Sequence, residues 1–138
     1  MDPLDFLNVA DGLCNSDAES DRRTSVGRSY FALFNCLRTK LEGIATLPAN
    51  DEAHKAVAYY LRRANNRELA SIGQSLTDLR VSRNGADYEL ESVVDRADSQ
   101  LALARARRAV SKLQALGDGR LANCVRAVPS FQSDRETR

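Results

Sequence analysis

The chain has 138 residues, 43% of them hydrophobic and 28% charged, with 7 glycines and 3 prolines. This length and composition are typical of one globular domain with a packed core, and they exclude a disordered chain. The 20 basic and 19 acidic residues give a net charge of +1. No strong overall field therefore draws the protein to nucleic acid or membrane, and such a partner would need a local basic patch.

Three cysteines, Cys14, Cys36 and Cys124, lie far apart and have no histidine cluster beside them. Their odd number and spacing argue against a disulfide framework and a zinc site, so we expect reduced, buried thiols, no metal and no cofactor. Residues 1–5 are acidic where a signal peptide would be basic, and no apolar run approaches the length of a membrane span. We therefore expect a cytoplasmic protein without membrane contact.

Five helix starts follow one another along the chain, each ahead of apolar residues spaced by three and four. Acids, capping boxes and a first-turn proline mark them. In chain order they are Asp2 before Pro3, the capping box from Ser16 to Glu19, Asn50 before two acids, Asn65 three residues before Glu68, and the box from Ser92 to Asp95.

The apolar stripes predict the buried faces of three helices. They comprise Val26, Tyr30, Leu33, Phe34, Leu37 and Leu41, then Leu69, Ile72, Leu76 and Leu79, then Val94, Ala97, Leu101, Ala104, Ala106, Val110 and Leu113. The second helix is expected to end at Gly43 in a left-handed cap, and the fifth near Gly117. These two segments have about 25 residues each, or about 37 Å as helix.

The pattern predicts an all-α fold, an up-and-down bundle of about five helices that occupies residues 1–117. Residues 118–138 are expected to hold a short docking helix, with Leu121, Cys124, Val125 and Val128 on its apolar side, and then a flexible polar tail from Pro129.

The candidate chemistry gathers in two places. The chain's one histidine, His54, lies in the first turn of the third helix, where the helix dipole favours the neutral ring. A structural or surface role for it is the simpler interpretation. If the fourth helix continues through residues 79–88, Arg83 and Asp87 share one face, as do Asn84 and Tyr88, which predicts an ion pair and a hydrogen bond. Alternatively, Gly85 ends the helix there.

Two segments carry a resemblance to a known family. Residues 28–34, Arg28-Ser29-Tyr30-Phe31-Ala32-Leu33-Phe34, resemble the Arg-x-Tyr-Tyr-Ala-x-Phe stretch on the long second helix of HEPN proteins. His54, together with Arg83 and the following Ala86-Asp87-Tyr88, resembles a small bacterial branch of that family with an Arg-x-x-Ala-Asp-Tyr motif. The similarity runs from about Pro3 to Leu116 and implies an HEPN-like helical bundle.

The resemblance also implies a function. In HEPN ribonucleases an arginine that contacts the scissile phosphate is followed, after four to six residues, by a histidine that moves a proton. Arg83 and Asn84 fit the first half, but positions 88–90 are Tyr88, Glu89 and Leu90, so the histidine is absent. A tyrosine is a poor base at neutral pH. The resemblance thus implies a catalytically reduced binding module for nucleic acid or nucleotide.

In that module, the expected ligand contacts are Arg80, Arg83 and Asn84, with Tyr30 and His54 as accessory residues. The resemblance further implies a homodimer, and a small nucleotidyltransferase or an antitoxin as partner in a toxin–antitoxin or defence pair. Two alternatives remain open. The first is a metal-independent ribonuclease with a substitute base, whose catalytic residues are unknown but would come from Arg83, Asp87 and Tyr88. The second is a purely structural partner domain.

Overall fold

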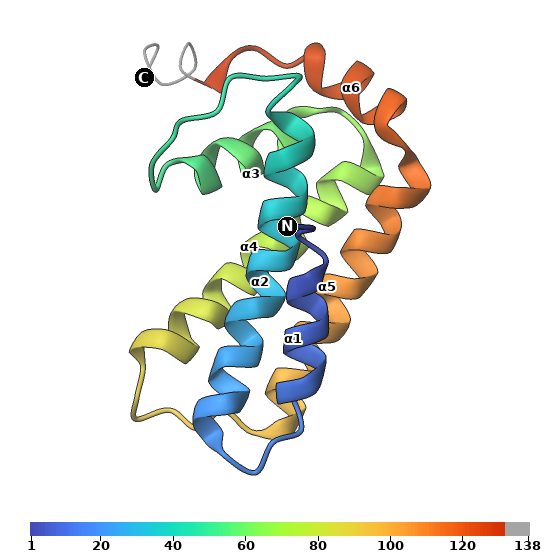
Figure 1. Cartoon of the computed structure of the whole chain (residues 1–138). Coiled ribbons are helices and arrows are strands. Elements are labelled where there is room, and N and C mark those ends of the chain that lie inside the picture. Colours follow the sequence, from blue (N-terminus) through green and yellow to red (C-terminus); the bar gives the residue numbers. More distant parts are fainter. Residues whose placement is uncertain (132–138) are drawn as a thin grey trace.

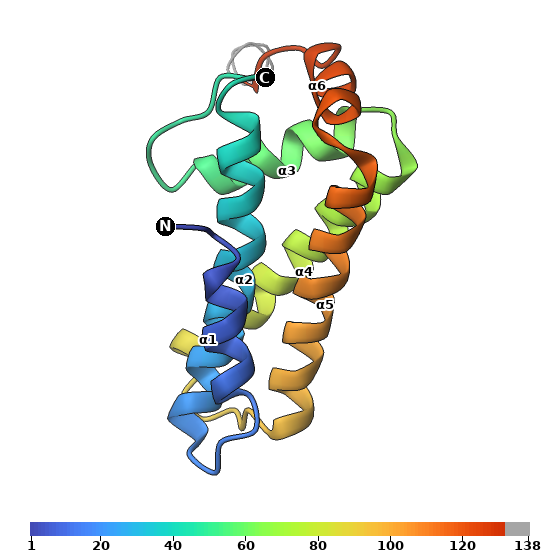
Figure 2. The same ribbon diagram turned by 45° about the vertical axis from the view of Figure 1, so that its right-hand side comes forward.

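The computed structural model describes residues 1–131, which form six helices and no strand. The helices are α1 (Asp5–Leu13), α2 (Glu19–Leu41), α3 (Ala53–Arg63), α4 (Arg67–Tyr88), α5 (Arg96–Leu116) and α6 (Asp118–Arg126) (Figure 1). Helices α1, α2, α4 and α5 alternate in direction along the long axis, while α3 and α6 lie at the end of the bundle where α2 finishes (Figure 2). The all-α helical bundle predicted from the sequence is confirmed.

Helix α2 is the centre of the bundle, because it packs against α1, α3, α4 and α5. Its predicted stripe, from Val26 to Leu41, is buried at every position, with no member more than 8% exposed. The α4 stripe of Leu69, Ile72, Leu76 and Leu79 is fully buried. Large aliphatic and aromatic side chains at helical spacing therefore identified the correct faces of α2 and α4.

The first half of the predicted α5 stripe is wrong except at Val94, which precedes the helix and is buried as predicted. Leu101 is 50% exposed, and Ala97 and Ala104 also face solvent. The buried face instead follows Ser99, Ala102, Leu103, Ala106, Ala109, Val110 and Leu113. Alanines lie on both faces of this helix, so the spacing of apolar residues did not distinguish the buried face from the exposed one. The face of α5 that packs into the bundle is the one that carries Ser99. Its hydroxyl donates to the Cys14 carbonyl oxygen over 2.6 Å.

The helices begin later than the cap signals predicted. The side chain of Asn66, not Asn65, caps α4 by accepting from the Leu69 N–H over 3.0 Å. At α5 the capping box joins Asp95 to Asp98 rather than Ser92 to Asp95. Each predicted cap lies close to another residue of capping type, and the spacing rule could not separate the two.

Similar offsets occur at the other helices. The residue before α2 is Ala18, and Ser16 instead accepts from the Ala18 N–H and donates to Asp21. Helix α2 ends at Leu41 without the left-handed cap expected at Gly43. A positive φ of 84° occurs instead at Gly117, where α5 gives way to α6. Glycine tolerates this conformation because it lacks a Cβ atom.

Arginine side chains close the end of the bundle at which α2 begins. The guanidinium of Arg23 donates to the carbonyl oxygens of Gly85, Ala86, Glu89 and Ser92 in the last turn of α4 and the turn that follows. Arg22 donates to the Val94 carbonyl oxygen over 2.9 Å and also to the loop before α2. The carbonyl groups of Ala86, Ser92 and Val94 have no backbone donor among the described residues, so the arginines satisfy them. Helix α4 accordingly continues through Gly85 to Tyr88.

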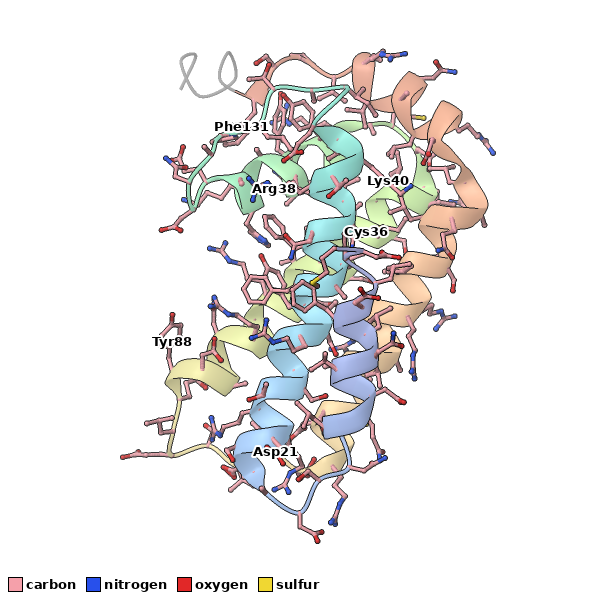
Figure 3. All side chains as sticks on the ribbon, viewed as in Figure 1. Asp21, Cys36, Arg38, Lys40, Tyr88 and Phe131 are labelled. Atoms are coloured by element: carbon pink, nitrogen blue, oxygen red, sulfur yellow. The ribbon has the colours of Figure 1, made fainter. Side chains whose placement is uncertain are left out.

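The opposite end is covered by α6 and the residues that follow it. Leu121 and Val125, two residues of the apolar side expected for the docking helix, are buried in α6. The expectation of a free tail from Pro129 is wrong for residues 129–131, because Phe131 is only 8% exposed and lies beside α3 (Figure 3). Tyr59 donates to the Pro129 carbonyl oxygen over 2.9 Å. The rest of the predicted polar tail, residues 132–138, lies outside the described residues.

Candidate functional site

An open cleft of about 400 Å³ lies along α3. Most of its lining comes from α3 and the residue before it, with one side chain from α4 and one from the segment after α6. The lining residues are Glu52, His54, Lys55, Ala58, Tyr59, Arg62, Arg80 and Phe131. Lys55 and Arg62 lie two turns apart on α3, and Arg80 enters from α4. One carboxylate, that of Glu52, accompanies these three cations.

Close packing of α3 on α4 brings the two sides of the cleft together. A short turn joins the two helices, and Gly73 of α4 faces Leu61 of α3. A Cβ atom at Gly73 would lie 3.2 Å from the Leu61 Cβ atom, so the glycine permits the approach. Further along α4, Arg80 comes close enough to His54 to affect its pKa. A connection this short is typical of a helical hairpin, in which consecutive helices pack against each other.

His54 forms the inner wall of the cleft. Its Nδ1 atom lies 2.8 Å from the hydroxyl oxygen of Tyr30 on α2, and the two residues are 7% and 4% exposed. The Tyr30 ring stacks on Phe34, which holds the phenol in place. Burial lowers the pKa of His54 to about 4, and the positive charge of Arg80 contributes to the shift. The ring is therefore neutral at pH 7.

Tyr30 connects the cleft to Arg83, which follows Arg80 by about one turn of α4. Burial raises the pKa of its hydroxyl to about 12, and the nearby charges of Arg80 and Arg83 partly oppose the increase. The phenol thus keeps its proton at neutral pH. The structure brings together four residues singled out from the sequence, Tyr30, His54, Arg80 and Arg83, from three different helices.

Arg83 is near this group but does not line the cleft. Its Nε atom lies 2.9 Å from Asp87 Oδ2, as the spacing of four predicted. The Nε–H group of Arg83 forms no hydrogen bond with a described acceptor, so its contact with Asp87 is an ion pair without a hydrogen bond. The guanidinium carbon lies 5.3 Å from the centre of the Phe31 ring and 5.8 Å from that of Tyr88. These contacts hold Arg83 against α2 and along its own helix.

The other residues of the predicted motif face outward. Tyr88 is 71% exposed, and Figure 3 shows it projecting from the far end of α4. The predicted Asn84–Tyr88 hydrogen bond is not found among the described contacts, and Asn84 accepts from Arg83 instead, over 3.3 Å. Asp87 is engaged with Arg83. The structure therefore separates Asn84, Asp87 and Tyr88 from the cleft that contains His54 and Arg80.

The cations of the cleft differ from Arg83 in having no acidic partner. Within residues 1–131, Lys55, Arg62 and Arg80 form no ion pair and no side-chain hydrogen bond. Lys55 and Arg62 are exposed, and Arg80 is half-buried. The sequence motifs pointed to Arg80 and His54, but they did not identify Lys55 and Arg62, the two cations that α3 contributes to the cleft. Their spacing of seven residues on one helix face was the available signal.

Several other kinds of site find no support in residues 1–131. No group of three or more histidine, cysteine or acidic side chains there could hold a metal ion. Cys14 and Cys36 are buried and Cys124 is half-buried, and all three are free thiols. None of the described helices combines the length and apolarity needed to cross a membrane.

Comparisons with known proteins identify distant relatives only. No family model matches the chain, and no solved structure matches it. An uncharacterized protein of Methanocaldococcus jannaschii is 30% identical over 89 residues, covering 53% of this chain and 50% of the relative. A second uncharacterized protein of the same organism is 29% identical over 109 residues, covering 67% of this chain and 66% of the relative. The chain thus spans about half to two thirds of the relatives it matches.

Proposed function

We propose that this protein is a binding module for a phosphate-bearing nucleotide, which it holds in the cleft between α3 and α4. The observation that carries the proposal is the set of cations in that cleft. Lys55, Arg62 and Arg80 have no acidic partner among residues 1–131 and line one cavity with a neutral histidine. A phosphate group supplies the charge and the acceptor oxygens that these side chains lack.

The surroundings favour a small ligand over a long nucleic acid. A cleft of about 400 Å³ falls within the usual range of small-molecule sites. The net charge of +1 provides little long-range attraction for a polyanion. The first turn of α3 also carries the positive end of a helix dipole, which adds to the potential around His54 and Lys55. We therefore favour a mononucleotide, with RNA as the competing ligand.

The arrangement gives less support to a ribonuclease. Arg83, the expected phosphate contact, is occupied by Asp87 and by two aromatic rings. His54 is the nearest substitute for the absent motif histidine, but a ring with a pKa of about 4 is a weak base at pH 7. A metal-independent HEPN ribonuclease thus remains the second candidate. A purely structural role is the third candidate, and it does not explain why the cleft contains cations without acidic partners.

We also propose that the protein forms a homodimer through an exposed apolar surface at the end of α4. The apolar stripe of α2 is buried inside the bundle and cannot form a dimer interface. Four other large apolar side chains are each more than 65% exposed, namely Val81, Tyr88, Leu90 and Val93. These residues lie on α4 and in the turn that follows it. Exposed apolar groups gathered in one region are typical of interaction surfaces. Light scattering at micromolar concentration tests the dimer, and a monomer would refute it.

The binding proposal is tested by titrating the protein with adenosine 5′-monophosphate at low salt. We expect Arg80→Ala to weaken binding at least about tenfold, because a half-buried arginine loses its contact with phosphate. Arg108→Ala, on the exposed side of α5, is the matched control and should bind like the wild type. A short single-stranded RNA without a terminal phosphate should bind more weakly than the nucleotide.

Two results would contradict the proposal. Equal binding by the wild type and Arg80→Ala, or no binding by either, would remove the cleft as the site. Preference for the RNA would replace the nucleotide by a nucleic acid. Cleavage of that RNA without metal, lost in Arg80→Ala, would make the ribonuclease the better account.

A further inference from the structure

We propose that Tyr30 holds His54 in the tautomer that carries its proton on Nε2, so that His54 presents a neutral N–H donor to the phosphate group bound in the cleft. This inference rests on the proposed function and assigns each residue a part in it. His54 would contact the ligand directly. Tyr30 would be a positioning residue that acts through His54.

The buried hydrogen bond between Tyr30 and His54 determines which atom of the ring carries the proton. The Tyr30 hydroxyl carries one proton, and its one described partner is His54 Nδ1 at 2.8 Å. If Nδ1 carried a proton and donated it, the phenolic proton would have no acceptor among residues 1–131. A buried donor without a partner is unfavourable. The hydroxyl therefore donates to Nδ1, and the proton of the neutral ring lies on Nε2.

The Nε2 atom of His54 is available to a ligand in the cleft. Nδ1 is taken by Tyr30, and His54 lines the cleft with its remaining surface. No described residue forms a hydrogen bond with Nε2. Tyr30 from α2 bonds to the ring and Arg80 from α4 affects its pKa. The other charged groups that line the cleft are Lys55 and Arg62 on α3 and Glu52 just before it. An Nε2–H group therefore joins three cations in facing the same space.

Lys55, Arg62, Arg80 and the Nε2–H group only donate hydrogen bonds, so their best ligand is one that only accepts. A phosphate monoester dianion has three terminal oxygens without protons, whereas a phosphodiester has two. The cleft should therefore prefer a terminal phosphate to an internal one. It also follows that His54 donates a proton to a hydrogen bond instead of removing one from a hydroxyl group.

The pH dependence of binding separates this arrangement from a charged histidine. A phosphate monoester gains its second negative charge with a pKa of about 6. With a neutral donor at His54, affinity should rise from pH 5 to pH 7 as the ligand ionises. With an imidazolium at His54, affinity would fall over the same interval as the ring lost its charge.

Nitrogen NMR reads the tautomer directly, because His54 is the chain's single histidine. In tag-free protein with labelled histidine, we expect a protonated Nε2 signal and an unprotonated Nδ1 signal. Tyr30→Phe should shift these signals toward a mixture of tautomers and weaken adenosine 5′-monophosphate binding about fivefold. His54→Gln keeps an amide N–H near the position of Nε2 and should bind better than His54→Ala.

The outcomes separate this inference from the proposed function. A protonated Nδ1, or an unchanged tautomer in folded Tyr30→Phe, overturns the inference. If Arg80→Ala still weakens binding in that case, the nucleotide site stands without the tautomer lock. Equal binding by His54→Gln and His54→Ala also overturns the inference, and this test does not depend on how well Tyr30→Phe folds. If the expected tautomer is found but no variant alters binding, the cleft itself is not the site.

Discussion

Arginines have opposite roles at the two ends of the bundle. At the end where α2 begins, Arg23 is 12% exposed and donates to four backbone carbonyl oxygens. In the cleft, Arg80 and Arg62 have no described acceptor. The last turn of α4 and the turn that follows it present backbone carbonyl groups to Arg23, whereas the cleft is lined by side chains of helices whose carbonyl groups are already bonded. An arginine thus becomes structural where backbone acceptors surround it, and remains available for a ligand where they do not.

The contrast extends along α4. Arg80 and Arg83 are neighbours one turn apart, yet Arg83 is paired with Asp87 and held between aromatic rings. The acid four residues after Arg83 has no counterpart after Arg80, where position 84 is Asn84. The presence of Asp87 therefore explains why Arg83 is paired within the protein while Arg80 remains available to a ligand.

The largest effect should come from Arg23→Ala. This change removes the described donor of the Ala86 and Ser92 carbonyl groups, and we expect the free energy of unfolding to fall by about 4 kcal/mol. Thermal or urea denaturation measures the loss. Arg108→Ala, exposed on α5, should change stability by less than about 0.5 kcal/mol. A loss below about 1 kcal/mol in Arg23→Ala would show that the carbonyl contacts contribute little.

A smaller effect should appear as a pH dependence of stability. The pKa of His54 is about 4 in the folded protein, below its ordinary value of 6.5, so the unfolded chain takes up the proton first as the pH falls. Its contribution to stability is complete above about pH 6.5 and is lost toward pH 4, with an upper limit of about 3 kcal/mol. Subtracting the profile of His54→Gln isolates this contribution. Parallel profiles for the two proteins would contradict it.

The smallest effect should come from Arg83→Ala. Its ion pair is partly exposed, with the Arg83 side chain 25% exposed and that of Asp87 38%, so the pair itself contributes little. Adding the lost ring contacts, we expect a decrease of about 1 kcal/mol in the free energy of unfolding. Nucleotide affinity should change less than about twofold, unlike in Arg80→Ala. A large loss of affinity in Arg83→Ala would place the ligand at the end of α4 and not in the cleft.

Local sequence signals predicted the parts of this fold that depend on local physics. The all-helical class, the buried faces of α2 and α4, the docking of α6 and the pairing of Arg83 with Asp87 all follow from spacings of three and four residues. Helix starts were displaced, because neighbouring Ser, Asn and Asp residues are all suitable caps. The face of α5 was partly missed, since alanines occur on both of its sides.

The candidate site depended on tertiary structure. Tyr30 and His54 are 24 residues apart in the chain, and only the packing of α3 against α2 and α4 brings them together beneath Arg80. Burial then makes the histidine neutral, a result that its position in a helix suggested but did not determine. Likewise, the sequence shows where the arginines lie along the chain. Only the tertiary structure determines which of them contact backbone carbonyl groups and which face an open cleft. Local spacing is set by the geometry of one helix, whereas a charge is neutralised or left available by groups that are distant in sequence.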